Sequence, residues 1–247
     1  MLTRILETLP HHWNLQQLYL GVNWTLSIIQ NQMGQWQAGL AATPAAEIVA
    51  AQSRYRLGLQ QPPVSDAIEL ARNVLASDPV EVTVGLATLN AFLQPAPALL
   101  VDIDAADWLL EHGRGRRVAL VGRFPFIEEL QPVVAQLWVL ELRPRAGEYG
   151  SDEAGSIIPQ ADVVAITSST LINHTLEDLL ALTQPEARVM LLGPSTPLTP
   201  LLFDFGIDLL SGVQVVEIET VLSSVADGVN FRKMKGVRRV SMQREYR

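Results

Sequence analysis

Cysteine is absent from the chain's 247 residues. Its absence excludes disulfides, thiolate metal sites and cysteine nucleophiles together, because each of them needs a thiol. Any metal ion would have to be held by histidine, carboxylate or carbonyl groups. A chain without disulfides is typical of a reducing compartment, so we expect a cytoplasmic protein.

Long apolar runs are also absent, although 48% of the residues are hydrophobic. Leucine, valine and alanine are spread in short runs, and none approaches the roughly 20 apolar residues that span a bilayer. The first residues, MLTRILETLPHHW, contain no apolar segment of the roughly 7–15 residues found in signal peptides. We therefore expect neither a membrane span nor export.

Positive charge is scarce, since 18 Lys and Arg stand against 26 Asp and Glu, for a net charge of −8. This balance argues against nucleic acid or an anionic membrane as a partner, because binding to phosphates needs clustered cations. The exception is the C-terminal end, which holds Arg232, Lys233, Lys235, Arg238, Arg239, Arg244 and Arg247. Val240 and Met242 alternate there with polar residues, so we interpret the run as an exposed edge strand followed by a tail.

The first third of the chain predicts strands followed by helices. Residues 15–29 have the composition of a strand, residues 31–39 supply turn residues, and residues 36–42 can return as the partner strand. Helical signals follow in residues 45–55, in residues 64–77 behind the cap candidate Ser65, and in residues 79–93. The last of these could also be a strand, because VEVTV is rich in β-branched residues. The prolines of residues 94–100 predict a linker, and we expect a first α+β domain over residues 1–98.

From Asp102 onward, short apolar strands alternate with helices, which is typical of a parallel sheet covered on both faces. Strands are expected at residues 117–122, 137–142, 161–167, 188–193 and 236–243, and a strand running into a helix at residues 213–228. Helices are expected at residues 103–113, 127–137, 175–183 and 198–206, with a capping box joining Thr175 to Asp178. The pattern predicts an α/β, Rossmann-like domain over residues 99–247.

Four of these strands are followed by polar or glycine-bearing loops, which is where an open parallel sheet binds its ligands. The candidate ligand-binding residues are Gly122, Arg123, Phe124, Pro125, Glu141, Thr167, Ser168, Thr170, Asn173, Thr175, Gly193, Pro194, Ser195 and Thr196. Ser195 or Thr196 could cap a helix begun by Pro197 and leave backbone N–H groups free for an anion. A plain helix cap there, and an exposed Ser/Thr turn at residues 167–175, are the structural alternatives.

Glu141 follows Gly122 by 19 residues, the position at which adenosine cofactors have their ribose hydroxyls bound. The loop after Gly122 reads GRFPF, however, so bulky residues replace the glycines that let a backbone approach a pyrophosphate. We therefore expect no tight binding of NAD or S-adenosylmethionine. Arg123 could reach a ligand carboxylate or pair with Glu141. Ser195 lacks the G-x-S-x-G context of a hydrolase, and His174, Asp102 and Asp104 show no metal-ligand spacing.

Several of these strings carry a family likeness: VALVGRFPF, VLELRP, IIPQADVVAITSSTLINHTLEDLL and VMLLGPSTPLTPLLFDFGIDLLSG. They resemble an uncharacterised bacterial and archaeal family with a domain proposed to chelate heavy metals, formerly a domain of unknown function. The likeness covers residues 102–245. Residues 1–98 are more loosely similar to that family's partner domain, which has a fold like the N-terminal domain of enolase, through LYLGVNWTLS and GLATLNAF.

The resemblance implies an enolase-N-like domain packed on a Rossmann-like domain, with a ligand pocket at their interface. It points to the candidate residues above other than Ser168, and to Gly212, and it implies a metal ion or a metal chelate as the bound group. His174 departs from the family, which more often has a small residue there. Our leading hypothesis is a protein that binds a small polar or anionic ligand or a metal chelate in metal homeostasis. An enzyme with an adenosine-type cofactor, methyltransferase- or dehydrogenase-like, and a structural or assembly protein are the alternatives, and a homo-oligomer is a further expectation.

Overall fold

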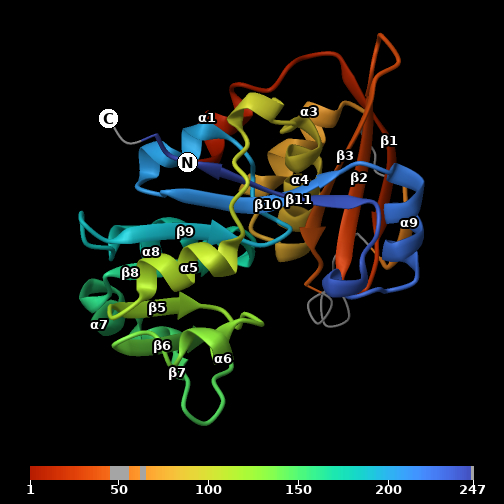
Figure 1. Ribbon diagram of the computed structural model, residues 1–247. Helices are drawn as coiled ribbons and strands as arrows, with labels where there is room; N and C mark the ends of the chain where they lie inside the picture. The colour runs from red at the N-terminus through yellow and green to blue at the C-terminus, as the bar shows by residue number, and fades with distance from the viewer. Residues whose placement is uncertain (45–55, 62–64, 246–247) are drawn as a thin grey trace. The chain divides into compact units, whose positions relative to one another are not determined.

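The computed structural model describes residues 1–44, 56–61 and 65–245 (Figure 1). The chain forms two compact units, each built from segments that are not contiguous in the sequence. Unit 1 comprises Met1–Leu99, Pro194–Thr199 and Gly212–Val240, and unit 2 comprises Leu100–Gly193, Pro200–Ser211 and Ser241–Arg247. The helix expected at residues 45–55 lies outside the described residues. The division into domains at residues 1–98 and 99–247 stays a prediction.

Unit 1 begins with a short helix, α1 (Leu2–Leu6), and an antiparallel sheet of order β3-β2-β1-β4. Its strands are β1 (Trp13–Leu20), β2 (Trp24–Asn31), β3 (Trp36–Ala42) and β4 (Gly58–Gln60). The single strand expected over residues 15–29 is wrong, because a tight turn at Gly21, whose N–H donates to the Trp24 carbonyl at 2.9 Å, divides it into β1 and β2. The hairpin that returns through residues 36–42 is confirmed, with Gln30 opposite Trp36.

Two further helices of unit 1 are α3 (Ala67–Ala71) and α4 (Pro79–Phe92). The expected cap at Ser65 is wrong: the Asp66 carboxylate accepts the Ile68 N–H at 2.8 Å, while the Ser65 carbonyl accepts the Leu15 N–H at 2.7 Å. α3 is also shorter than expected, because residues 72–75 continue it as a tighter 3₁₀ turn. The helix after Pro79 is confirmed.

Both faces of the unit 1 sheet are covered, by α4 on one side and by α9 (Ile218–Ala226) on the other (Figure 1). Side chains alternate between the faces of a strand. Leu26 and Ile28 accordingly pack with Val221 and Val225 of α9, whereas Ser27 accepts a hydrogen bond from the Thr88 hydroxyl of α4 at 2.9 Å. Cover on both faces explains why β2 is buried throughout its centre, from Thr25 to Ile29.

The second sheet has seven strands among the described residues, in the order β11-β10-β9-β8-β5-β6-β7. They are β5 (Arg117–Val121), β6 (Gln136–Glu141), β7 (Tyr149–Gly150), β8 (Val163–Thr167), β9 (Arg188–Leu192), β10 (Leu209–Val215) and β11 (Val237–Gln243). The pairs from β10 to β7 are parallel. The predicted strands are confirmed, except that β10 begins at Leu209 rather than at residue 213, and the basic edge strand β11 is exposed only in its first half, because Val240 and Met242 are buried. The strand order reverses direction between β5 and β8, where doubly wound sheets bind ligands.

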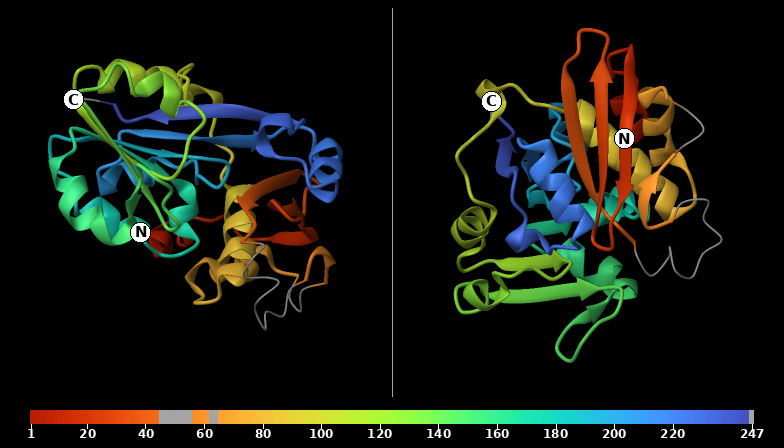
Figure 2. Two further views of the ribbon diagram at one scale, coloured as in Figure 1. Left: turned by 90° about the horizontal axis from the view of Figure 1, so that it is seen from below. Right: turned by 90° about the vertical axis from the view of Figure 1, so that its right-hand side faces the viewer.

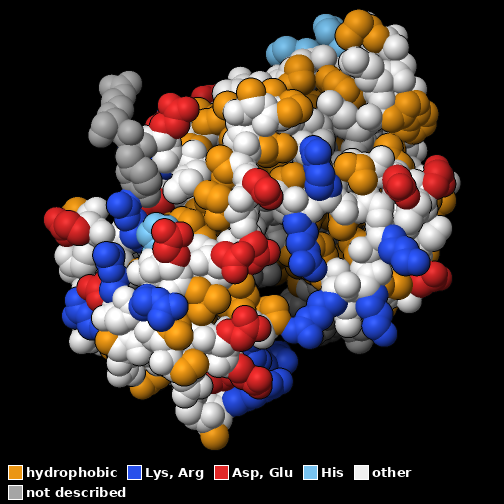
Figure 3. Space-filling view, in the orientation of Figure 1, with side chains coloured by type: hydrophobic (Ala, Val, Ile, Leu, Met, Phe, Trp, Pro, Cys, Tyr) orange, Lys and Arg blue, Asp and Glu red, His pale blue; other side chains and the backbone are white. Residues whose placement is uncertain are grey.

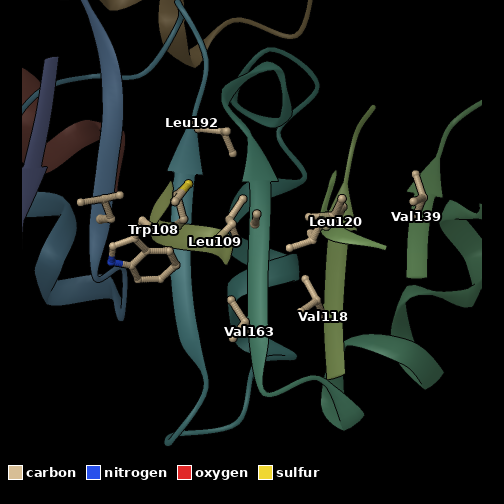
Figure 4. Packing of buried hydrophobic residues seen from close by; sticks show 11 residues of the cluster. Trp108, Leu109, Val118, Leu120, Val139, Val163 and Leu192 are labelled. Atoms are coloured by element: carbon tan, nitrogen blue, oxygen red, sulfur yellow. The ribbon is translucent and has the colours of Figure 1, made fainter. Parts of the chain in front are cut away.

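One hydrophobic cluster of unit 2 lies on one face of this sheet (Figure 4). Alternate residues of β5 and β8, such as Val118, Leu120 and Val163, pack there against Trp108 and Leu109 of α5 (Ala105–Gly113). α8 (Leu176–Ala181) covers the opposite face, as Figure 2 shows. α6 (Ile127–Leu130) and α7 (Ala154–Ile157) are single turns.

Three local expectations in unit 2 are wrong. α6 ends before Pro132, whose ring is incompatible with a helix interior, so no helix extends over residues 127–137. Residues 198–206 form only a 3₁₀ turn, Pro200–Phe205. The capping box at Thr175 does not form, because its hydroxyl donates to Asn173 Oδ1 at 2.7 Å instead. The fold class, an α/β chain with a mostly parallel sheet after an antiparallel one, is confirmed, and the finer likeness to the enolase N-terminal domain stays a prediction.

Candidate ligand-binding site

The carboxyl ends of three adjacent strands of unit 2 meet at two glycines and two hydroxyl residues. Gly122 follows β5 with φ +111° and Gly193 follows β9 with φ +127°, conformations that side-chain-bearing residues rarely adopt. A Cβ placed on Gly122 would lie 3.1 Å from Cβ of Thr167, and one placed on Gly193 would lie 2.7 Å from Oγ of Ser168. The structure therefore brings together four residues that the sequence singled out in three separate loops.

Ser168 holds the least satisfied hydroxyl of this group. Its side chain is buried, with 1% of the residue exposed, and its hydroxyl makes no hydrogen bond to any residue that the structure describes. Thr167 is half-buried, and its hydroxyl makes only two long hydrogen bonds of 3.4 Å: it accepts the Ser169 N–H and donates to Ser169 Oγ. Buried hydroxyls are normally hydrogen-bonded, so the Ser168 hydroxyl remains available to a ligand or to water, while the Thr167 hydroxyl makes only weak contacts within its own turn.

The rest of the loop after β8 uses its polar atoms to build its own turn. The Thr170 hydroxyl donates to the Thr167 carbonyl at 2.7 Å, and the Thr170 carbonyl accepts the Thr175 N–H at 3.0 Å. Asn173 Oδ1 accepts from both the N–H and the hydroxyl of Thr175. His174, exposed, takes φ +57° in this turn. Thr170, Asn173 and Thr175 thus act as turn-forming residues.

Arg123, in the loop after β5, binds a carboxylate that the sequence reasoning missed. Its Nε and Nη2 atoms donate to the two carboxylate oxygens of Glu148 at 2.5 and 2.6 Å, and Nη2 also donates to the Arg143 carbonyl at 2.8 Å. The hydrogen bonds from Arg123 lower the pKa of Glu148 from 4.5 to about 2, and the Arg145 N–H adds to this. Arg123 therefore fastens the β6–β7 loop. The signal that could have found Glu148 is its place in that loop, close to Arg143 and Arg145.

Glu141 lies at the end of β6, with its Oε1 atom 3.8 Å from Nη1 of Arg123. Its side chain is 20% exposed, so it does not project freely into solvent. The Phe124 ring folds back over the strand end, with Cζ 3.6 Å from where a Gly122 Cβ would be, and stacks on Phe126 at 5.4 Å. Pro125 is exposed beside them. Aromatic side chains thus occupy the place at which a phosphate would approach the backbone.

The segment after Gly193 belongs to unit 1, and there Ser195 has a structural partner. Its Oγ accepts the N–H of Ala42, on the edge strand β3, at 2.8 Å, and its carbonyl accepts a hydrogen bond from Asn90 at 3.1 Å. The expected helix cap is wrong, because no helix begins at Pro197 and the Ser195 hydroxyl satisfies an unpaired strand N–H instead. Anion binding by this loop stays a prediction.

Thr196, next to Ser195, remains unsatisfied. It is 2% exposed, and its hydroxyl has no partner among the described residues. Its neighbour in space is Gly212 of β10, where an added Cβ would lie 3.2 Å from the Thr196 Cβ. Pro194, half-buried, makes the turn into this segment. The sequence could not distinguish Thr196 from Ser195.

These groups do not form a protein-only metal site. In the part of the chain that the structure describes, no three His, Asp or Glu residues are placed to hold a metal ion together. The polar groups near the strand ends are hydroxyls, an arginine and carboxylates already near that arginine. Soft heavy metals prefer thiolates, which the chain lacks. The site therefore suits hydrogen bonding to a ligand better than direct coordination of a heavy metal.

Residues 104–243 match the model of the DUF364 family, described as "Putative heavy-metal chelation". The chain belongs to this family. Residues 4–93 match a second model, DUF4213, with the same description. An uncharacterized protein of Methanocaldococcus jannaschii is 28% identical over 152 residues, which make up 59% of this chain and 59% of that protein. The chain thus spans about three-fifths of the length of this curated relative.

Two solved structures of DUF364 proteins of unknown function share the fold over nearly the whole chain. The protein from Desulfitobacterium hafniense DCB-2 is 25% identical, with a TM-score of 0.82 over 98% of this chain and 97% of that one. The protein from Pyrococcus horikoshii is 19% identical, with a TM-score of 0.83 over 98% of each chain. The family resemblance drawn from the sequence is confirmed. Separately, no described helix has the length and apolar character to cross a membrane, and a cytoplasmic location stays a prediction.

Proposed function

We propose that this DUF364 protein binds a small polar or anionic molecule at the carboxyl edge of its parallel sheet. The observation that carries the proposal is Ser168, a residue that is only 1% exposed and whose hydroxyl has no partner among the described residues. It lies beside Gly193, and Thr167 lies beside Gly122. Hydroxyls both donate and accept, so the pair suits carboxylate, hydroxyl or carbonyl groups of a ligand.

The family's description points to metal-related binding. The residues at the strand ends favour a metal ion that is already coordinated by an organic chelator. A chelate needs hydrogen bonds from the protein to its organic part rather than a complete set of protein ligands. No such protein set occurs among the described residues. We therefore propose an organic anion, alone or as a metal chelate, as the bound species, in keeping with a role in metal homeostasis.

An enzyme with an adenosine-type cofactor is less well supported. The switch in strand order between β5 and β8 would favour it, because such cofactors bind there. Glu141 would then bind the ribose, but it lies 3.8 Å from Arg123, and Phe124 covers Gly122. A ligand that needs no close backbone approach fits these contacts better.

Native mass spectrometry of the full chain purified from its own host, followed by metal analysis, tests the proposal. We expect a small organic molecule to be retained by the unsubstituted protein and lost from Ser168→Ala. Ser169→Ala is the matched control, because Ser169 is exposed one residue further on, and it should retain the molecule.

Four results would contradict the proposal. A metal ion retained without any organic molecule would favour direct chelation. Equal retention by Ser168→Ala and by the control would place the ligand elsewhere. Micromolar binding of NAD or S-adenosylmethionine in calorimetry would favour an enzyme with an adenosine-type cofactor. A protein that retains nothing from its host would favour a structural or assembly role.

A further inference from the structure

A cationic surface lies in unit 1, between α9 and the start of β11. It consists of Arg232, Lys233, Lys235, Arg238 and Arg239, all exposed, and we call it the basic surface. The two lysines in it are the only two in the whole chain. Figure 3 shows lysine and arginine side chains gathered where this part of unit 1 reaches the surface. The concentration is unusual for a chain with a net charge of −8.

The cations of the basic surface have no acidic partners among the described residues. Arginines of unit 2 differ, since Arg117 and Arg123 bind Asp162 and Glu148. In the basic surface, Arg238 donates instead to the neutral side-chain oxygen of Gln214 at 2.5 Å. Arg239 lies over the Phe231 ring, 5.2 Å from its centroid. These contacts fix two guanidinium groups in place without neutralising their charge.

The loop that carries the basic surface is held firmly by neutral contacts. Phe231 packs on Trp24 at 5.7 Å between ring centroids, and the Trp24 indole N–H donates to the Val229 carbonyl at 3.0 Å. Asn230 Oδ1 accepts the Arg232 N–H at 3.0 Å. The positions of the cations are therefore preorganised, which lowers the entropy lost when a partner binds.

Two exposed aliphatic residues contact the loop that carries the basic surface. Val216 is 56% exposed, and its N–H donates to the carbonyl of Gly236, within the loop. Val22 is 47% exposed and lies against Gly228, at the loop's beginning. A phosphate polymer has no aliphatic side chains that could pack against these valines, whereas acidic protein segments commonly include apolar side chains.

We propose that the basic surface binds a short acidic segment of a partner protein, with carboxylates on the five cations and aliphatic side chains against Val22 and Val216. The charge distribution favours a short segment. Unit 1 has nine cationic and nine acidic residues, whereas unit 2 has nine and seventeen. Outside the basic surface, unit 1 has more acidic than cationic residues, so attraction to an anion is confined to the basic surface and a short segment is enough to use it.

Fluorescence anisotropy of the full chain with a labelled peptide of glutamates and interspersed leucines tests this inference. We expect binding that weakens as salt rises, because exposed ion pairs are screened. The triple variant Arg232→Gln/Lys233→Gln/Lys235→Gln should weaken it roughly tenfold, since each exposed pair adds only a modest factor. Arg72→Gln/Arg114→Gln/Arg116→Gln makes the same change of charge at exposed arginines elsewhere and should change the affinity less than about twofold.

The same assay can show that the inference is wrong or that the partner belongs to another class of molecule. Equal weakening by both triple variants would mean nonspecific attraction and overturn the inference. So would tighter binding of single-stranded DNA or of phosphatidylserine vesicles than of the peptide. Self-association of the unsubstituted chain that the first triple variant abolishes would make the occupant a second copy instead. An all-glutamate peptide should bind several-fold more weakly than the mixed one. Equal affinity would show that Val22 and Val216 do not contribute to binding.

Discussion

Two hydroxyl-bearing segments, residues 167–170 and 193–196, follow the neighbouring strands β8 and β9 and look equally suited to a ligand in sequence. The structure uses them differently. Ser195 accepts the N–H of Ala42 at the unpaired edge of β3, where Thr83 and Asn90 also donate to carbonyls of that strand. Ser168, equally buried, satisfies no such group. A buried serine is therefore a ligand candidate only after the backbone groups around it have been accounted for.

Gly193→Ala should have the largest effect on this comparison. Its φ of +127° and the 2.7 Å approach of a Cβ to Ser168 Oγ predict a loss of about 2–5 kcal/mol in the free energy of unfolding. Urea unfolding measures it. Gly206→Ala is the control, because Gly206 has φ +86° with no atom near its absent Cβ, and should cost only about 1–2 kcal/mol. Equal losses would mean that the contact with Ser168 is unimportant.

Ser195→Ala should come next, with a loss of about 1–3 kcal/mol, because it leaves the Ala42 N–H without its acceptor. The same change at the exposed Ser169 should stay within about 0.5 kcal/mol. Thermal unfolding of the two variants side by side checks the difference. A Ser195→Ala protein as stable as the control would show that this hydrogen bond does not stabilise the fold, and Ser195 would again be a candidate ligand-binding residue.

Thr196→Val should have a smaller effect of the opposite sign. Valine keeps the shape of threonine but removes a buried hydroxyl that has no partner among the described residues. We expect a change between zero and about 1 kcal/mol of stabilisation in the same unfolding assay. A clear destabilisation would show that the hydroxyl has a partner, such as a buried water.

The pair formed by Arg123 and Glu148 should give the smallest effect, visible only in acid. The pKa of Glu148 is lowered from 4.5 to about 2, so its contribution to stability is present above about pH 4.5 and is lost as the pH falls towards 2. Asp162, held by Arg117, has its pKa lowered to about 2 and adds a similar loss. Glu148→Gln should flatten the decline in melting temperature between pH 5 and pH 3, whereas Glu129→Gln, at an exposed carboxylate, should leave it as it is. An unchanged slope in Glu148→Gln would contradict the pairing.

Strand composition and glycine placement predicted much of unit 2 correctly. Its buried strands are continuous apolar runs, which only a sheet covered on both faces accommodates, and each ends at a polar or glycine residue. Gly122 and Gly193 were recognisable because such strand ends bind ligands. The division of residues 15–29 into β1 and β2 was not predictable from composition. Gly21 is required there by contact with α9, where an added Cβ would lie 2.5 Å from the Val225 carbonyl.

The sequence by itself determined the alternation of elements, the family, the absence of thiol chemistry and the residues that gather at the strand ends. These properties depend on local pattern and composition. Tertiary structure alone decided which polar groups stay unsatisfied: it paired Arg123 with Glu148, Ser195 with Ala42 and Arg238 with Gln214, and it left Ser168 and Thr196 without partners among the described residues. The physical reason is that the partners are 25, 153 and 24 residues apart along the chain, and a hydrogen bond over such separations depends on the packing of whole strands and helices rather than on neighbouring residues.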